Sequence, residues 1–214
     1  METKFYKTAG VCLLVGAIVM VATMVLHPVG GSLRRILAMY NMIIVSHSMA
    51  MIAIPFVAFG FYGLSKLLQE SRRIAELAFT IVAFSMVAVL IGGVLNGFAL
   101  PFFVRDQANQ LSSNEFMLVT IVRYGFAISR AMDYLFIAGT MLSVGIWSML
   151  ILRSKRLSRG LGWLGIVLIT ASFLGLVTGF NFLNVSGFTV FVLGLVSWIV
   201  LTGLSMIFIG KNTQ

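Results

Sequence analysis

Cysteine and acidic residues are scarce in this chain of 214 residues, and each shortage removes a class of protein. The one cysteine excludes a disulfide framework within the chain and a cage of thiolate metal ligands. The six acidic residues are too few for a di-iron carboxylate centre. The HExxH, phosphate-binding GxxxxGK[ST] and GxSxG motifs of hydrolases and nucleotide-binding enzymes are missing as well. The sequence therefore favours a binding or structural protein over an enzyme.

Charged residues of both signs are also few. They make up 10% of the chain and hydrophobic residues 60%, whereas soluble domains are about a quarter charged and about half apolar. No Pro/Ser-rich linker or long polar segment divides the chain. We therefore expect residues 1–214 to form a single all-α domain, a polytopic bundle of transmembrane helices.

Six apolar stretches meet the length of about 20 residues that a spanning helix needs. They cover residues 8–26, 36–64, 74–103, 133–152, 161–182 and 187–209. The fourth stretch is preceded by residues 116–132, which have helical apolar spacing of their own. The whole run from 116 to 152 would reach about 55 Å as one helix, against a hydrocarbon core of about 30 Å. Residues 116–132 therefore either project from the outer surface or form a separate interfacial helix.

The basic residues predict how the chain is threaded. With the N-terminus inside, ten Lys and Arg residues face the cytoplasm and five the other side, an imbalance that follows the positive-inside rule. The inner set is Lys4, Lys7, Lys66, Arg72, Arg73, Arg153, Lys155, Arg156, Arg159 and Lys211. The sequence thus predicts both termini in the cytoplasm. The net charge of +9 is explained by topology and by contact with membrane lipids, without a nucleic-acid partner.

Two segments carry a resemblance to a known family. The segment GIWSMLILRSKRLSRGLGWLGIVL (residues 145–168) joins the fourth and fifth spans, and Thr8, Ala9 and Gly10 open the first. Both segments resemble those of a bacterial family of small six-helix integral membrane proteins known as a domain of unknown function. The resemblance implies a multi-pass protein of the bacterial inner membrane and supplies no activity.

Four polar residues lie at one depth when they are counted from the basic ends of their spans. His27, His47, Asn96 and Asp133 are each about 19 to 23 residues away, or about 28 to 35 Å along a helix. Arg123 and Arg130 lie beyond them, seven residues apart on one helix face. One interpretation is a ligand-binding pocket between helices one to four that opens outward and accepts a small lipophilic or anionic ligand. The other is that residues at this depth are simply wet.

The two histidines allow a second function. His27 and His47 could ligate a haem, or a metal ion together with Asp133, which would make the chain a membrane redox protein. Asp133 could instead pair with Arg130, three residues earlier on the same helix face.

Small residues allow a third function. Gly93-x-x-x-Gly97 and Gly175-x-x-x-Gly179 have the spacing of helix-packing motifs. They predict an accessory subunit that docks partner helices, or a homo-oligomer. A small transporter is a further alternative.

Overall fold

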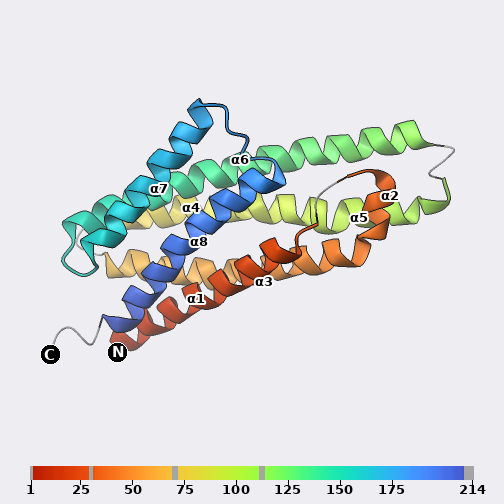
Figure 1. The fold of residues 1–214 in the computed structure, drawn as a ribbon. Helices are drawn as coiled ribbons and strands as arrows, with labels where there is room; N and C mark the ends of the chain where they lie inside the picture. Colours follow the sequence, from red (N-terminus) through yellow and green to blue (C-terminus); the bar gives the residue numbers. More distant parts are fainter. Residues whose placement is uncertain (1, 29–30, 69–71, 111–113, 210–214) are drawn as a thin grey trace.

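The computed structural model describes residues 2–28, 31–68, 72–110 and 114–209, and every regular element in these ranges is a helix (Figure 1). The helices are α1 (Glu2–Leu26), α2 (Leu33–Ala38), α3 (Tyr40–Leu67), α4 (Arg72–Val94), the π-helix η2 (Leu95–Ala99), α5 (Leu100–Asp106), the 3₁₀-helix η3 (Ala108–Gln110), α6 (Glu115–Arg153), α7 (Arg159–Val177) and α8 (Val185–Phe208). Six helical segments are long and apolar enough to cross a membrane. The chain is a multi-pass helical membrane protein, and its all-α class is as predicted.

Two of the predicted spans need correction at their ends. Residues 36–64 were expected as one helix, but residues 33–38 form the separate helix α2, which Ser32 caps by accepting a hydrogen bond from the Arg35 N–H. The fifth span was expected to reach residue 182, yet α7 ends at Val177. Gly179 adopts a φ of 81° there, the Phe180 N–H donates to Gly175 O and the Gly179 N–H donates to Leu176 O. This pattern is a Schellman C-cap, which needs glycine because of its positive φ.

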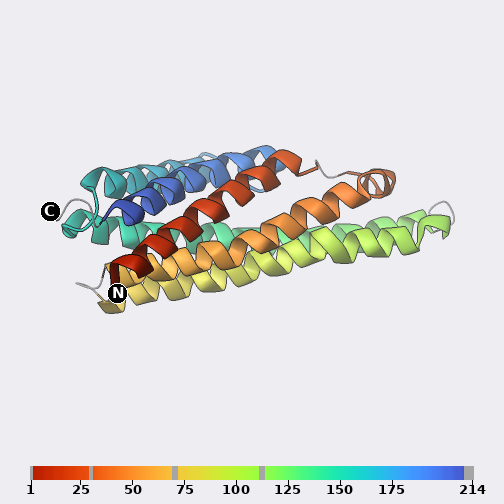
Figure 2. The same cartoon turned by 90° about the horizontal axis from the view of Figure 1, so that it is seen from below.

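The start of α1, the end of α3, the start of α4, the α6–α7 connection and the end of α8 lie at one end of the bundle (Figures 1 and 2). We call it the basic end because Lys66, Arg73, Arg153, Lys155, Arg156 and Arg159 lie there. Lys211, which was counted with them, lies outside the described residues.

Small residues bring α1 against α3 and α8, its main neighbours. A Cβ at Gly63 of α3 would collide with Ala9 of α1. Where α1 meets α8, a Cβ at Gly10 would lie 2.6 Å from Gly203 O, and one at Gly203 would lie 2.8 Å from Gly10 O. Ala9 and Gly10, noted above for a family resemblance, are therefore packing residues in this bundle.

An aromatic cluster fills the core near the basic end. The ring centroids of Phe61 and Trp147 are 4.8 Å apart, and those of Trp147 and Trp198 are 6.3 Å apart and stacked. Both tryptophans are fully buried, and their indole N–H groups donate to Ser65 Oγ and Leu161 O. Hydrogen bonds thus satisfy both indole N–H groups that this core buries.

The opposite end of the bundle is drawn out into an extension. Residues 116–132 continue the fourth span without a break as part of the 39-residue helix α6, so they are not a separate interfacial helix. At 1.5 Å per residue α6 is about 58 Å long, about twice the hydrocarbon thickness. α3, α4 with α5, and α6 all run past the ends of α1 and α8 (Figures 1 and 2). The extension has a hydrophobic cluster of its own, formed by Leu33, Ile36, Leu100, Val104, Leu118 and Val122.

Candidate functional site

A cavity of 670 Å³ lies inside the bundle where the extension begins. All six residues predicted to form a pocket line it: His27, His47, Asn96, Arg123, Arg130 and Asp133. The prediction placed the pocket between helices one to four, but the sixth span contributes as well. Phe188, Val192, Leu195 and Ile199 of α8 form part of the wall. Their apolar side chains carry no sequence signal that separates a cavity wall from lipid contact.

The cavity has a polar and an apolar part. His27, His47, Asn96, Ser129 and Asp133 form a set that we call the polar belt, and Arg35, Arg123 and Arg130 are exposed next to it. Toward the basic end the lining becomes apolar. It consists there chiefly of Met20, Met24, Ala53, Val57, Phe61, Val82, Met86, Val89, Phe136, Val192, Leu195 and Ile199. The cavity therefore resembles a ligand site in which a few polar groups orient an apolar body.

His47 is held in a fixed orientation on α3. Its side chain is 8% exposed, and its Nδ1 lies 2.9 Å from Ile43 O and 3.4 Å from Ser46 Oγ. Gly97 leaves space for the ring, because a Cβ at that position would collide with His47. Gly97 belongs to the π-helix η2, a type of turn that is frequent at functional sites. The two glycines of the predicted Gly93-x-x-x-Gly97 motif thus have roles within the chain: Gly97 packs against the His47 ring, and Gly93 lines the cavity.

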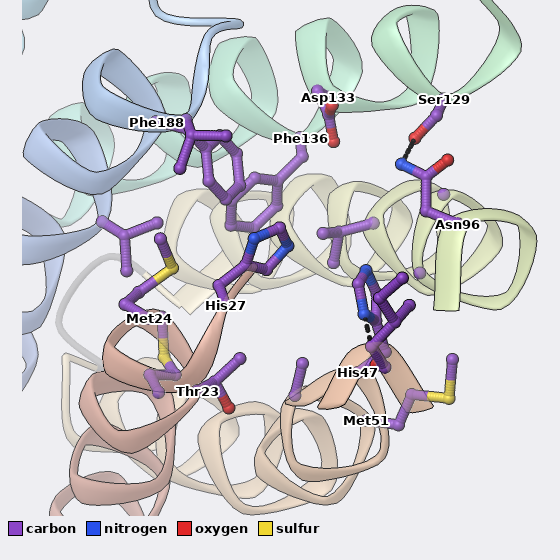
Figure 3. A pocket seen from close by; sticks show the side chains of 18 of the residues that line it. Thr23, Met24, His27, His47, Met51, Asn96, Ser129, Asp133, Phe136 and Phe188 are labelled. Atoms are coloured by element: carbon purple, nitrogen blue, oxygen red, sulfur yellow. Dashed lines mark hydrogen bonds between the residues drawn. The ribbon is translucent and has the colours of Figure 1, made fainter. Parts of the chain in front are cut away.

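His27 meets His47 from the end of α1. The two ring centroids are 5.0 Å apart at 49°, and His27 Nδ1 lies 3.1 Å from Pro28 O. Burial lowers the pKa of His27 below its ordinary value, so its ring is neutral at neutral pH. Figure 3 shows both rings beside the cavity, with Phe136 above His27.

Asn96 and Asp133 enter the belt from η2 and α6. The Asn96 amide Nδ2 donates to Ser129 Oγ at 2.6 Å, whereas its Oδ1 is buried without a partner (Figure 3). No ion pair or hydrogen bond reaches the half-buried Asp133 carboxyl group from the described residues. The ion pair expected between Arg130 and Asp133 is therefore not formed, and Arg130 is exposed.

Sequence reasoning missed several polar lining residues. Thr23 and Thr140 are 5% and 1% exposed, and their hydroxyl groups have no hydrogen-bond partner among the described residues. A helical stripe through Asp133 could have revealed Ser129 and Thr140, because residues four before and seven after share its face. Thr23 carries no comparable signal, since a threonine in an apolar helix commonly bonds its own backbone.

The belt is a poor match for the haem or metal alternative. No group of three His, Cys, Asp or Glu side chains in the described part of the chain is arranged to hold a metal ion. Two axial histidines of a haem lie on opposite faces of the macrocycle, whereas the rings of His27 and His47 pack against each other.

Comparison of the chain with protein-family models, with curated proteins and with solved structures finds no match. The resemblance to a six-helix family of unknown function stays a prediction.

The second glycine motif also makes a contact within the chain. Gly175 contacts Phe182, and Gly179 lies in the turn beyond α7. The hypothesis of an accessory subunit or a homo-oligomer stays a prediction.

Proposed function

We propose that this protein binds a small lipophilic molecule in the cavity, within a bacterial inner membrane and with both termini in the cytoplasm. The imbalance of ten basic residues against five supports the orientation. The basic end would then face the cytoplasm, and the extension would stand in the periplasm. The cavity would open near the outer surface of the membrane.

The observation that carries the proposal is the composition of the cavity. Its 670 Å³ falls within the range of about 300–1,000 Å³ that small-molecule sites occupy. Its depth is lined by methionine, valine, leucine and phenylalanine side chains, which suit an apolar body. Methionine adapts to irregular ligand shapes because it is unbranched and flexible. The arginines that would attract an anion are exposed beside the belt, outside this apolar depth.

The test fills the cavity without changing the protein's surface. Gly93 lines the cavity, and a Cβ there would have only Met51 as a close neighbour, at 3.5 Å. Gly93→Phe should therefore project a ring into the cavity. Val94→Phe is the matched control, because Val94 is the next residue, is 46% exposed and does not line the cavity.

Native mass spectrometry of the purified protein reads the result. We expect a small lipophilic molecule to be retained by the unchanged protein and by Val94→Phe, and to be lost from Gly93→Phe. A folded protein that retains nothing, or an adduct that survives equally in all three proteins, would contradict the proposal. Thermal unfolding of each variant shows whether Gly93→Phe keeps its fold.

A further inference from the structure

The two histidines of the polar belt present hydrogen-bond acceptors to the cavity. Each Nδ1 lies against a backbone carbonyl oxygen, Pro28 O for His27 and Ile43 O for His47. A carbonyl oxygen can only accept, so in a neutral imidazole ring at either position Nδ1 carries the proton. The Nε2 atom then has a free lone pair and no proton to donate. No hydrogen bond from the described residues uses either Nε2.

Asn96 and Asp133 add acceptors to the same belt. One N–H of the Asn96 amide donates to Ser129 Oγ, and its buried Oδ1 has no donor among the described residues. The Asp133 carboxyl group has no partner among the described residues, and its carbonyl oxygen accepts in either protonation state. Because buried polar groups are nearly always hydrogen-bonded, the buried Asn96 Oδ1 indicates a missing donor, and the other acceptors lie beside it in the lining.

The charged residues near the belt limit which kind of ligand headgroup can donate the hydrogen bond. A carboxylate headgroup has only acceptor oxygens, so it would leave Asn96 Oδ1 and the two histidine Nε2 atoms without a donor. An ammonium group would donate and an ionised Asp133 would attract it, but the three positive charges of Arg35, Arg123 and Arg130 lie beside the belt and repel a cation. A neutral hydroxyl group donates a hydrogen bond and avoids both conflicts.

We infer that the ligand of this cavity is a neutral lipophilic alcohol whose hydroxyl group donates to the polar belt while its apolar body fills the depth of the cavity. This inference rests on the proposed function and specifies its ligand class. Thr23 and Thr140, which are buried and unpartnered farther along the cavity, can accept from or donate to further oxygens on the same molecule. Long-chain alcohols and quinols share this hydroxyl chemistry.

A headgroup series on one tail tests the inference. Purified protein in detergent is mixed with equal amounts of 1-dodecanol and its methyl ether, which differ in the hydroxyl proton, and native mass spectrometry compares their occupancy. Dodecylamine and dodecanoate then compete in the same way. We expect the alcohol to be preferred over the ether by about tenfold, since it donates one more hydrogen bond. We expect it to exceed the amine and the carboxylate as well.

Two variants connect the preference to the belt. Asp133→Asn keeps the shape of the side chain but adds an amide donor, and should reduce the preference for the alcohol over the ether several-fold. Asp106→Asn makes the same change at an exposed residue of α5 that does not line the cavity, and should leave the preference unchanged.

The outcomes separate this inference from the proposed function. Equal binding of alcohol and ether, or a preference for amine or carboxylate, overturns the inference and leaves a lipophilic ligand in place. Binding of none of the four probes counts against both. The same assay compares decylubiquinol and decylubiquinone with 1-dodecanol, and this distinguishes a quinol from a long-chain alcohol as the source of the hydroxyl group. Tighter binding of the quinol than of 1-dodecanol points to a quinol, and the reverse points to a long-chain alcohol.

Discussion

Replacing Ser65 by alanine should destabilise the bundle although the change in side-chain size is small, because the Ser65 hydroxyl group makes two buried hydrogen bonds. Ser65 Oγ donates to Ala75 O at 3.0 Å and accepts from Trp147 Nε1 at 3.0 Å. One hydroxyl group thereby joins α3, α4 and α6 in a region where Ser65 is 2% and Trp147 0% exposed. Alanine removes both hydrogen bonds and strands the indole N–H in an apolar core.

The expected loss follows from general magnitudes. Hydrogen bonds between membrane helices contribute about 0.6 kcal/mol on average and up to about 1.7 kcal/mol. A stranded buried donor costs about 1–3 kcal/mol. We therefore expect Ser65→Ala to lower the free energy of unfolding by about 2 kcal/mol, or about 30-fold in the equilibrium constant. Titration with sodium dodecyl sulfate in mixed micelles, followed by tryptophan fluorescence, measures this change.

Ser143→Ala is the matched control. Ser143 is as buried as Ser65, but its hydroxyl group donates only to Gly139 O, one turn earlier in its own helix. Such a bond adds little to helix stability, so we expect a loss below about 0.5 kcal/mol. Trp147→Phe completes a double-mutant cycle with Ser65→Ala, in which the coupling energy should be about 1 kcal/mol. Equal losses in the two alanine variants, or no coupling in the cycle, would refute the reasoning.

Two further predictions concern packing and threading. Gly203→Val should lower the free energy of unfolding by about 2 kcal/mol through overpacking against α1, because a Cβ at position 203 would lie only 2.8 Å from Gly10 O. Gly194→Val, whose Cβ would be an ordinary 3.4 Å from Leu168, should change it by less than about 0.5 kcal/mol in the same titration, and similar losses would contradict the contact. In a Cys12→Ser background, a membrane-impermeant maleimide should label Asn109→Cys in intact cells and Lys155→Cys only after permeabilisation. The reverse pattern would invert the proposed orientation.

The depth of a residue along its helix was predicted best from the sequence, because each residue adds a fixed rise and basic residues mark one end of each span. Counting from the basic residues at 1.5 Å per residue placed His27, His47, Asn96 and Asp133 at one depth, and the structure has all four in the lining of one cavity. Depth along an axis can be counted in this way without any knowledge of how the helices pack. The number of spans was predictable from the lengths of the apolar stretches, and the structure has six helical segments that can cross a membrane.

Rotation about the helix axes could not be predicted, because it depends on which neighbour each face meets. Gly93 and Gly97 have the spacing of a docking face, but packing turns Gly97 onto His47 of the same chain. Likewise, Arg130 and Asp133 have the spacing of an ion pair on a single helix, yet Asp133 lies half-buried at the cavity and Arg130 is exposed. Phe188 of α8 belongs to the cavity only because α8 packs on α1.

The π-helix between α4 and α5 sets the rotational register of an entire span. Each residue of an α-helix turns the chain by about 100°, so the one-residue surplus in a π-turn rotates everything beyond it relative to everything before it. Before this turn, Gly92 and Gly93 line the cavity. Beyond it, Val104 lies in the hydrophobic cluster of the extension, and Leu100 belongs both to that cluster and to the cavity lining. Deleting one residue from Leu95–Ala99 would restore a regular helix and would turn Leu100 and Val104 away from that cluster. Along this span, the rotation of α5 about the helix axis is thus set independently of that of α4, by the five residues Leu95–Ala99.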